Sequence, residues 1–142
     1  MNNQKNYLTK KEKLNITDRI RSQLKRDQRI LFAFLHGSFL EADIGFSDID
    51  VAVFIDDNCF SGDIIDFCLT ISAELTLLVH RRVDVHCLNT SSAGFKYEVT
   101  KGDLLFAKDE EVCFDFIEKT WLEYFDLKHL YKDSLNDLLA IY

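Results

Sequence analysis

The spacing of apolar residues divides the chain into amphipathic segments and short, continuously apolar ones. In the first amphipathic segment, Ile16, Ile20 and Leu24 recur every four residues, so their side chains share one face of a helix. The outer positions of this segment are mostly basic or polar, and similar helical periodicity recurs further along the chain. The predicted helices span residues 9–29, 63–80, 91–100 and 110–139.

The apolar segments between these helices are short and rich in branched and aromatic residues, which favours buried strands. They span residues 30–35, 49–55, 83–88 and 104–107. Helices and strands therefore follow one another in the order α-β-β-α-β-α-β-α. This order predicts an α/β (α+β) fold, in which a small mixed β-sheet is flanked by helices and followed by a C-terminal helix.

Composition narrows the class of protein. With 47% apolar and 29% charged residues, the chain has the make-up of an ordinary globular protein. Its apolar stretches are much shorter than the roughly 18 residues that a membrane-spanning helix needs. The first residues, 1–13, lack the apolar centre of a secretory signal. We therefore expect a cytoplasmic protein without membrane contact.

Charge is distributed unevenly along the chain. Residues 1–29 contain nine Lys and Arg against three Asp and Glu, whereas the remainder contains eight against twenty-one, which gives the net charge of −7. An acidic surface repels nucleic-acid phosphates, so we expect no direct nucleic-acid binding. The basic segment fits either a solvated helix face or contact with an acidic partner.

The segment that joins the first two predicted strands carries the candidate chemistry. Gly37 lacks a Cβ, so a phosphate can approach the backbone there, and Ser38 offers a hydroxyl and an N–H group. Asp48 and Asp50 open the next strand two residues apart, so both carboxylates leave the same face, with their Cα atoms about 6–7 Å apart. Either fragment alone is common in ordinary turns. Their combination on a strand, a loop and a second strand favours phosphate and metal binding.

A third carboxylate, Asp84, lies within a strand that is otherwise apolar, where an unpaired charge is costly. If this strand neighbours the one that carries Asp48 and Asp50, the three carboxylates converge. A divalent cation would relieve their repulsion, and oxygen ligands suit Mg²⁺ or Mn²⁺. Two such ions about 4 Å apart are the equipment of in-line nucleotidyl transfer.

With these residues the sequence resembles the DNA polymerase beta-type nucleotidyltransferase superfamily, and most closely its minimal nucleotidyltransferase (MNT) branch. The likeness rests on Gly37-Ser38, the pair Asp48-x-Asp50 and the later strand carboxylate Asp84. It also extends over residues 83–90, 96–99 and 102–106. The resemblance implies a single nucleotidyltransferase domain over residues 1–142, with a core at about 14–108 and a helical tail at 109–142.

The resemblance also implies a function. MNT proteins are commonly antitoxins of HEPN/MNT toxin–antitoxin pairs, and transfer AMP from ATP to a tyrosine hydroxyl of the HEPN RNase toxin. By this likeness Asp48, Asp50 and Asp84 are the catalytic and metal-binding residues, and Asp84 helps activate the acceptor hydroxyl. Gly37 and Ser38 would bind the nucleotide. The implied cofactor is Mg²⁺, as two ions, with ATP as substrate and the HEPN toxin as partner.

Two further functions remain open. Glu41 stands where the family commonly has Arg, and nine residues separate Ser38 from Asp48 where the family usually has ten. These differences keep a non-catalytic antitoxin, which neutralises its toxin by binding alone, as an alternative. A nucleotidyltransferase that modifies a small molecule is the other, although some 34 residues after the core leave little room for a substrate domain.

The last predicted helix carries more apolar residues than one buried face needs, including Trp121, Phe125 and Tyr131. This helix could simply wrap the sheet, but we predict that part of its apolar face docks a partner, either the toxin or a second copy of the chain. Two histidines accompany the candidate site: His36 precedes Gly37, and His86 shares a strand face with Asp84. For His86 we favour a buried core histidine over a hydrogen bond to a carboxylate.

Overall fold

The computed structural model describes residues 7–41 and 45–140. Its helices are α1 (Lys10–Lys25), α2 (Ile64–Val79), α3 (Ala93–Thr100) and α4 (Glu110–Ala140). Its strands are β1 (Ile30–His36), β2 (Ile49–Ile55), β3 (Val83–Cys87) and β4 (Asp103–Ala107). Short 3₁₀ turns follow β1 and β3, at Ser38–Leu40 (η1) and Leu88–Thr90 (η2). These elements confirm the predicted order of helices and strands.

The four strands form one mixed sheet in the order β3-β2-β1-β4. Strand β1 pairs antiparallel with both β2 and β4, whereas β2 and β3 are parallel. Parallel neighbours cannot be joined by a tight turn, and α2 provides the longer connection between them. The predicted fold class, a small mixed sheet flanked by helices, is confirmed.

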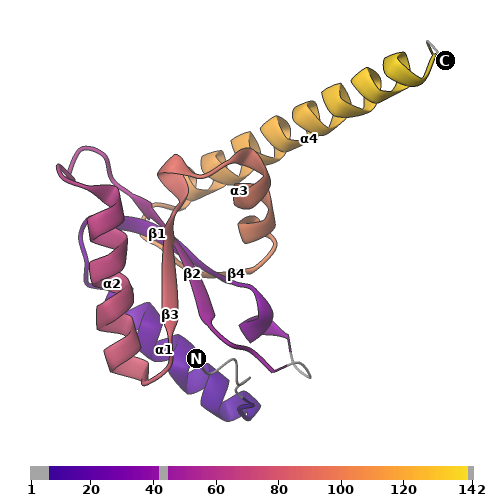
Figure 1. Ribbon diagram of the computed structural model, residues 1–142. Coiled ribbons are helices and arrows are strands. Elements are labelled where there is room, and N and C mark those ends of the chain that lie inside the picture. The colour runs from indigo at the N-terminus through magenta and orange to yellow at the C-terminus, as the bar shows by residue number, and fades with distance from the viewer. Residues whose placement is uncertain (1–6, 42–44, 141–142) are drawn as a thin grey trace.

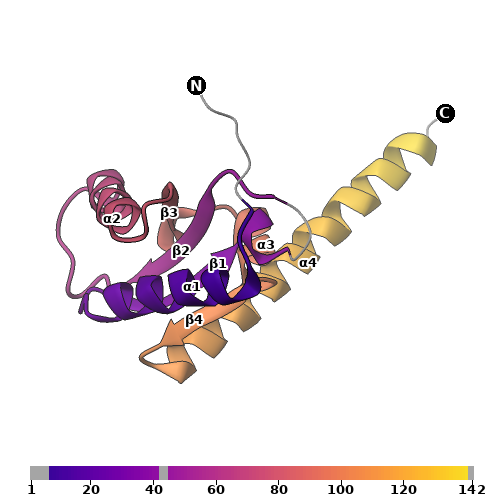
Figure 2. The ribbon, with the colours of Figure 1, turned by 90° about the horizontal axis from the view of Figure 1, so that it is seen from below.

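Helices cover both faces of the sheet (Figures 1 and 2). On one face, α1 and α2 bury a core that includes the inward side chains of β2, namely Ile49, Val51, Val53 and Ile55, all at most 1% exposed. On the other face, α3 and α4 pack against Phe32, Phe34 and Ala52. The period of two along β2 therefore sends Ile49, Val51, Val53 and Ile55 to one core and leaves Asp50 and Ala52 on the other face.

Polar caps set the helix boundaries in a chain that contains no proline. Thr9 and Glu12 form a reciprocal capping box at the start of α1, and Asp63 and Ser92 accept backbone N–H bonds at the starts of α2 and α3. His80 ends α2 in the left-handed conformation, with φ of 56°. Local side-chain chemistry thus determines where three of the helices begin.

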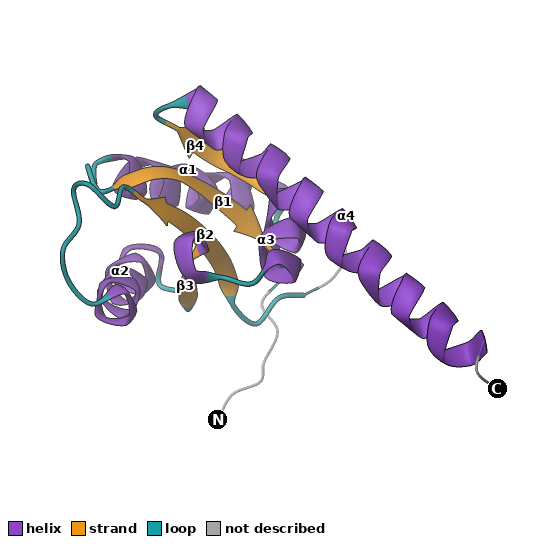
Figure 3. Cartoon of the chain, turned by 90° about the horizontal axis from the view of Figure 1, so that it is seen from above, coloured by secondary structure: helices purple, strands orange, loops and turns teal. Residues whose placement is uncertain are grey.

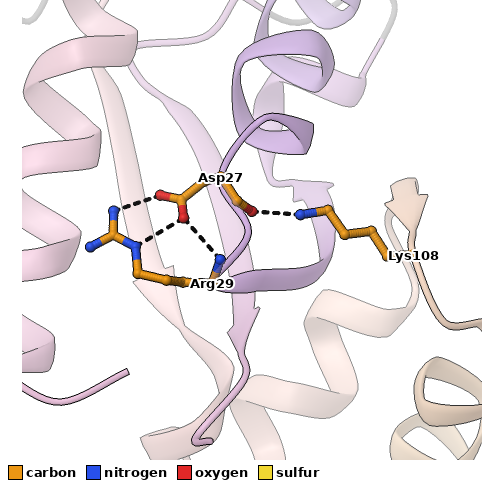
Figure 4. A network of polar contacts seen from close by, with 3 residues as sticks. All are labelled: Asp27, Arg29 and Lys108. Carbon is orange, nitrogen blue, oxygen red and sulfur yellow. Dashed lines mark hydrogen bonds and ion pairs between the residues drawn. The ribbon is translucent and has the colours of Figure 1, made fainter. Parts of the chain in front are cut away.

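One polar network joins the turn after α1 to the start of α4 (Figure 4). The Asp27 carboxylate accepts hydrogen bonds from the Arg29 backbone N–H, Nε and Nη2 at 3.0, 2.9 and 2.7 Å, and Lys108 donates to the Asp27 carbonyl. The side-chain hydrogen bond from Arg29 is the main reason why the pKa of Asp27 lies below its ordinary value. This network fixes the entry into the central strand β1.

The two halves of α4 have different surroundings. In the first half Cys113 and Thr120 are buried, and the Phe116 ring lies 5.2 Å from that of Phe32. Tyr124 stacks on Tyr97 of α3 at 3.9 Å between ring centroids. From residue 125 to 140 every residue is exposed, and the helix extends away from the sheet (Figures 1 and 3). The first half of α4 therefore covers the sheet, and the second half does not.

Among the helices described within 7–41 and 45–140, none combines the length and the apolar character that a bilayer crossing requires.

Candidate active site

The sheet brings the predicted carboxylates to one place. In the register of the sheet, Asp50 of β2 lies opposite Asp84 of β3 on one side and opposite His36 of β1 on the other. Directly opposed residues point to the same face, and Asp48, in the bend just before β2, lies beside Asp84, as their shared contact with Arg82 shows. The sequence predicted that the three carboxylates converge if the strand of Asp84 lies beside the strand of Asp50. In the structure these two strands, β3 and β2, are neighbours.

Burial and the neighbouring carboxylate of Asp84 destabilise the charged forms of Asp48 and Asp50. Burial, and then the nearby Asp84 carboxylate, raise the pKa of both Asp48 and Asp50 above its ordinary value. The side chains of Asp48 and Asp84 keep 31% and 33% of their surface exposed, so a solvated ion can reach them. An incoming cation would be attracted by all three groups.

The candidate metal ligands of this site are the carboxylate oxygens of Asp48, Asp50 and Asp84. Carboxylate oxygens suit Mg²⁺ chemically. With the side chains as they stand, no three His, Cys, Asp or Glu residues within the described ranges are arranged to hold a metal ion. Instead Arg82 Nε lies 3.7 Å from Asp48 Oδ1 and 3.4 Å from Asp84 Oδ1. The chemistry of the site fits a divalent cation, and a guanidinium lies close to two of its carboxylates.

Gly37 lies directly against this site. Its φ is +84°, a conformation that L side chains rarely adopt, and a Cβ at this position would lie 2.5 Å from Asp50 Oδ2. The turn that continues through Ser38 into η1 thus brings bare backbone up to the carboxylate. Glycine is required here both by the backbone conformation and by the lack of space.

A lysine that the sequence analysis did not single out holds the loop after Gly37. Lys13 of α1 donates hydrogen bonds to the backbone carbonyls of Phe39 and Glu41, both at 2.9 Å. Its Nζ also lies 5.3 and 5.4 Å from the ring centroids of Phe39 and Phe46. The Glu41 side chain is exposed. Because Lys13 is 26 residues before Phe39, only the tertiary structure reveals this contact.

The two histidines differ in their surroundings. Burial, together with the nearby His86, lowers the pKa of His36 to about 4, and its Nε2 has no hydrogen-bond partner among the described residues. His86 is exposed, so the interpretation of His86 as a core histidine was wrong. The reason is that β3 is an edge strand: the His86 ring meets Phe95 of α3 and His36 of β1, at 5.3 and 6.2 Å between ring centroids, and still remains exposed to solvent.

Side chains of α2 accept hydrogen bonds from the backbone N–H groups on the outer edge of β3. The backbone N–H groups of Val83 and Val85 donate to the hydroxyls of Thr76 and Ser72 at 3.0 and 2.9 Å. These bonds occupy groups with which another strand could otherwise pair. A surface groove remains between α2 and β3, and Ser72, Asp84 and His86 contribute to its lining. Asp84 therefore faces both the other carboxylates and a groove that is open to solvent.

A mixed sheet with three strand carboxylates beside a glycine turn is the arrangement expected of a nucleotidyltransferase. Residues 18–111 match the family described as "Polymerase beta, Nucleotidyltransferase". The match spans most of the chain, which therefore belongs to this family. No curated protein matches the sequence significantly.

Several solved structures share the fold. One is the complex of tri-AMPylated Shewanella oneidensis HEPN toxin with MNT antitoxin, with 20% identity, a TM-score of 0.68, and coverage of 89% of this chain and 98% of the other. A toxin–antitoxin structure with AMP-PNP has 20% identity, a TM-score of 0.67 and coverage of 88% and 98%. The toxin–antitoxin MntA-HepT has 19% identity, a TM-score of 0.62 and coverage of 92% and 99%. At these identities the likeness establishes the fold.

Proposed function

We propose that this chain is a Mg²⁺-dependent nucleotidyltransferase that transfers AMP from ATP to a tyrosine hydroxyl of a HEPN RNase toxin, and so acts as the antitoxin. The observation that carries the proposal is the alignment of Asp48, Asp50 and Asp84 on one face, with Gly37 against Asp50. Membership of the nucleotidyltransferase family supports the reaction class. The solved HEPN–MNT complex of similar fold supports the choice of partner. We place the reaction in the cytoplasm.

In the proposed reaction the tyrosine oxygen attacks the α-phosphorus of ATP. A bond forms between these two atoms, the bond from the α-phosphorus to the oxygen that bridges to the β-phosphate breaks, and pyrophosphate leaves. Asp84, beside the open groove, accepts the proton of the hydroxyl. Asp48, Asp50 and Asp84 would hold two Mg²⁺ ions, which when bound neutralise charge on the phosphates and lower the pKa of the acceptor hydroxyl.

The turn at Gly37 and Ser38 would receive the triphosphate. At Gly37 the backbone carries no side chain and lies against Asp50, and Lys13 fixes the following residues through the carbonyls of Phe39 and Glu41. The exposed position of Glu41 allows its carboxylate to face water. A carboxylate that faces water repels a triphosphate bound at this turn less than one directed into the turn.

A non-catalytic antitoxin is the second candidate function. It is favoured by one observation, the acidic residue Glu41 at the end of η1, next to the proposed triphosphate turn. In that case the chain would neutralise the toxin by covering its active surface, without transferring a nucleotide.

One experiment separates the two functions. The chain is incubated with Mg²⁺, ATP labelled at the α-phosphate and a HEPN toxin encoded beside it, in parallel with the Asp48→Asn/Asp50→Asn variant. We expect label on a toxin tyrosine and loss of RNase activity with the wild type alone. Equal neutralisation by both proteins without label would contradict catalysis and support neutralisation by binding.

A further inference from the structure

Arg82 occupies a distinctive position immediately before β3. Its Nε lies within 3.7 Å of Asp48 Oδ1 and 3.4 Å of Asp84 Oδ1, so one guanidinium is shared by carboxylates from two neighbouring strands. The preceding residue, Arg81, lines a separate surface depression with Glu12 and Val79 instead. The alternation along the chain therefore directs Arg82 to the face that carries the carboxylates.

The contact between Arg82 and the two carboxylates is weak enough for a metal ion to replace the guanidinium. Arg82 keeps 71% of its side chain exposed, and both distances exceed those of a close hydrogen-bonded pair. Exposed ion pairs of this kind stabilise a fold only weakly. A divalent cation carries twice the charge of a guanidinium, and carboxylate oxygens coordinate it directly. It would therefore compete successfully with Arg82 for the same two groups.

We infer that Arg82 is the internal counter-ion of the carboxylate site: it neutralises Asp48 and Asp84 while no metal is bound, and a divalent cation displaces it on binding. The inference rests on the proposed function, because it concerns the same carboxylates. Arg82 is thus a positioning residue that sets the metal affinity of the site. Its removal leaves like charges uncompensated, which costs stability without metal and favours metal uptake.

The test measures Mn²⁺ binding, by titration of the free ion, for the wild type and for Arg82→Gln, Arg82→Lys and the control Arg19→Gln. Arg19 lies on the exposed surface of α1, so its variant removes the same charge at a distance from the site. We expect Arg82→Gln to bind Mn²⁺ about 3- to 10-fold more tightly, the order expected for losing two weak ion pairs. Arg82→Lys and Arg19→Gln should stay close to the wild type.

Thermal unfolding gives a second readout that does not depend on activity. At low salt and without metal, Arg82→Gln should unfold at a lower temperature than Arg19→Gln, and saturating Mn²⁺ should remove this difference. Equal or weaker Mn²⁺ binding by Arg82→Gln would overturn the inference and leave the proposed function standing. If the wild type binds no more Mn²⁺ than Asp48→Asn/Asp50→Asn, the metal site itself is refuted, together with the proposed function.

Discussion

Gly37 shows how a single residue limits the candidate site. The sequence indicated that a phosphate could approach the backbone here, and the structure adds a second constraint, since the Asp50 carboxylate fills the space in which a Cβ would lie. Backbone conformation and site geometry therefore both require the absence of a side chain.

We expect Gly37→Ala to weaken binding of an ATP analogue in the presence of Mg²⁺ by at least about tenfold. The backbone conformation of Gly37, with positive φ and extended ψ, costs an L residue roughly 1–3 kcal/mol, and the new methyl group would also displace Asp50. Fluorescence titration with a labelled ATP analogue measures the change. Gly94→Ala on α3 is the matched control, because a Cβ there meets nothing within 4 Å.

Unchanged nucleotide affinity in a folded Gly37→Ala protein would contradict the placement of the nucleotide at this turn. Gly94→Ala should keep its affinity and gain up to about 1 kcal/mol in unfolding free energy, because alanine is the better helix former. Circular dichroism on both variants distinguishes a lost site from a lost fold.

The residues of the candidate site also differ in how easily their roles can be predicted from the sequence. Asp48, Asp50 and Asp84 stand out because charged residues interrupt apolar strands. Lys13 and Arg82 do not, because an isolated basic residue on a polar helix face or before a strand is ordinary. Their importance depends on distances of 2.9 Å to loop carbonyls and 3.4–3.7 Å to carboxylates, which involve other parts of the chain.

At the scale of elements, the network around Asp27 joins the turn before β1 to the residue that follows β4 (Figure 4). Because β1 lies between β2 and β4 in the sheet, this turn helps align the strand that carries His36 and leads into Gly37. Loss of the Asp27 network would therefore be expected to disturb the position of β1 and, with it, the candidate active site.

We expect Asp27→Asn to lower the free energy of unfolding by roughly 1–2 kcal/mol at pH 7, because it removes charge-assisted hydrogen bonds to Arg29. Since folding lowers the pKa of Asp27, its contribution is present above the unfolded pKa of about 4 and disappears as the pH falls through the lower folded value. Urea unfolding between pH 7 and pH 2.5 measures both effects.

The control for this prediction is Asp18→Asn. Asp18 pairs with Arg21 on α1 and its side chain is 71% exposed, so its loss should change stability by less than about 0.5 kcal/mol. Equal destabilisation of the two variants at pH 7, or an Asp27→Asn effect that persists undiminished at pH 2.5, would refute the role given to the network.

The starts of the helices were largely predictable because they depend on neighbouring residues, whereas α1 ends at Lys25 and not at the predicted residue 29. The capping side chains Thr9, Asp63 and Ser92 stand where the helical periodicity begins, and the observed starts of α1, α2 and α3 follow each of them directly. The extent of α4 was also predicted, since its periodicity is long and continuous. Its two different environments could not be predicted, because apolar residues occur along its whole length.

At the scale of the whole molecule, α4 is the element that extends beyond the body. The exposed half carries Leu127, Tyr131, Leu135 and Leu138 at spacings of four, four and three, which places them along one side of the helix. Such a stripe is typical of a helix that packs against another helix. For this chain we assign it to the proposed toxin partner, and self-association remains an outcome of the test.

We expect Tyr131→Glu/Leu135→Glu to weaken toxin binding by at least about tenfold, because the charges would be buried in the interface. Calorimetry with a HEPN toxin measures the affinity. Both residues are exposed, at 76% and 55%, so the melting temperature and nucleotide binding should not change. Ser134→Glu/Asn136→Glu adds the same charge at polar positions of the helix and should bind the toxin normally.

Undiminished toxin binding by the Tyr131/Leu135 variant would exclude this surface as the toxin contact. Light scattering on the isolated chain shows whether a second copy covers it, in which case the mass would fall from dimer to monomer in the same variant. A truncation to test α4 should end after Phe125. Ending at Lys108 would also remove Cys113 and Thr120, which are buried in the body.

The sequence by itself determined the elements, the fold class and the identity of the candidate carboxylates. Each of these depends on periodicity, caps and residue types that act over a few positions along the chain. Only the tertiary structure decided that β3 lies parallel to β2, so that Asp84 meets Asp50, and that Lys13 and Arg82 reach the same site. These are contacts between residues distant in the chain, and they depend on which surfaces become buried together when all the elements pack.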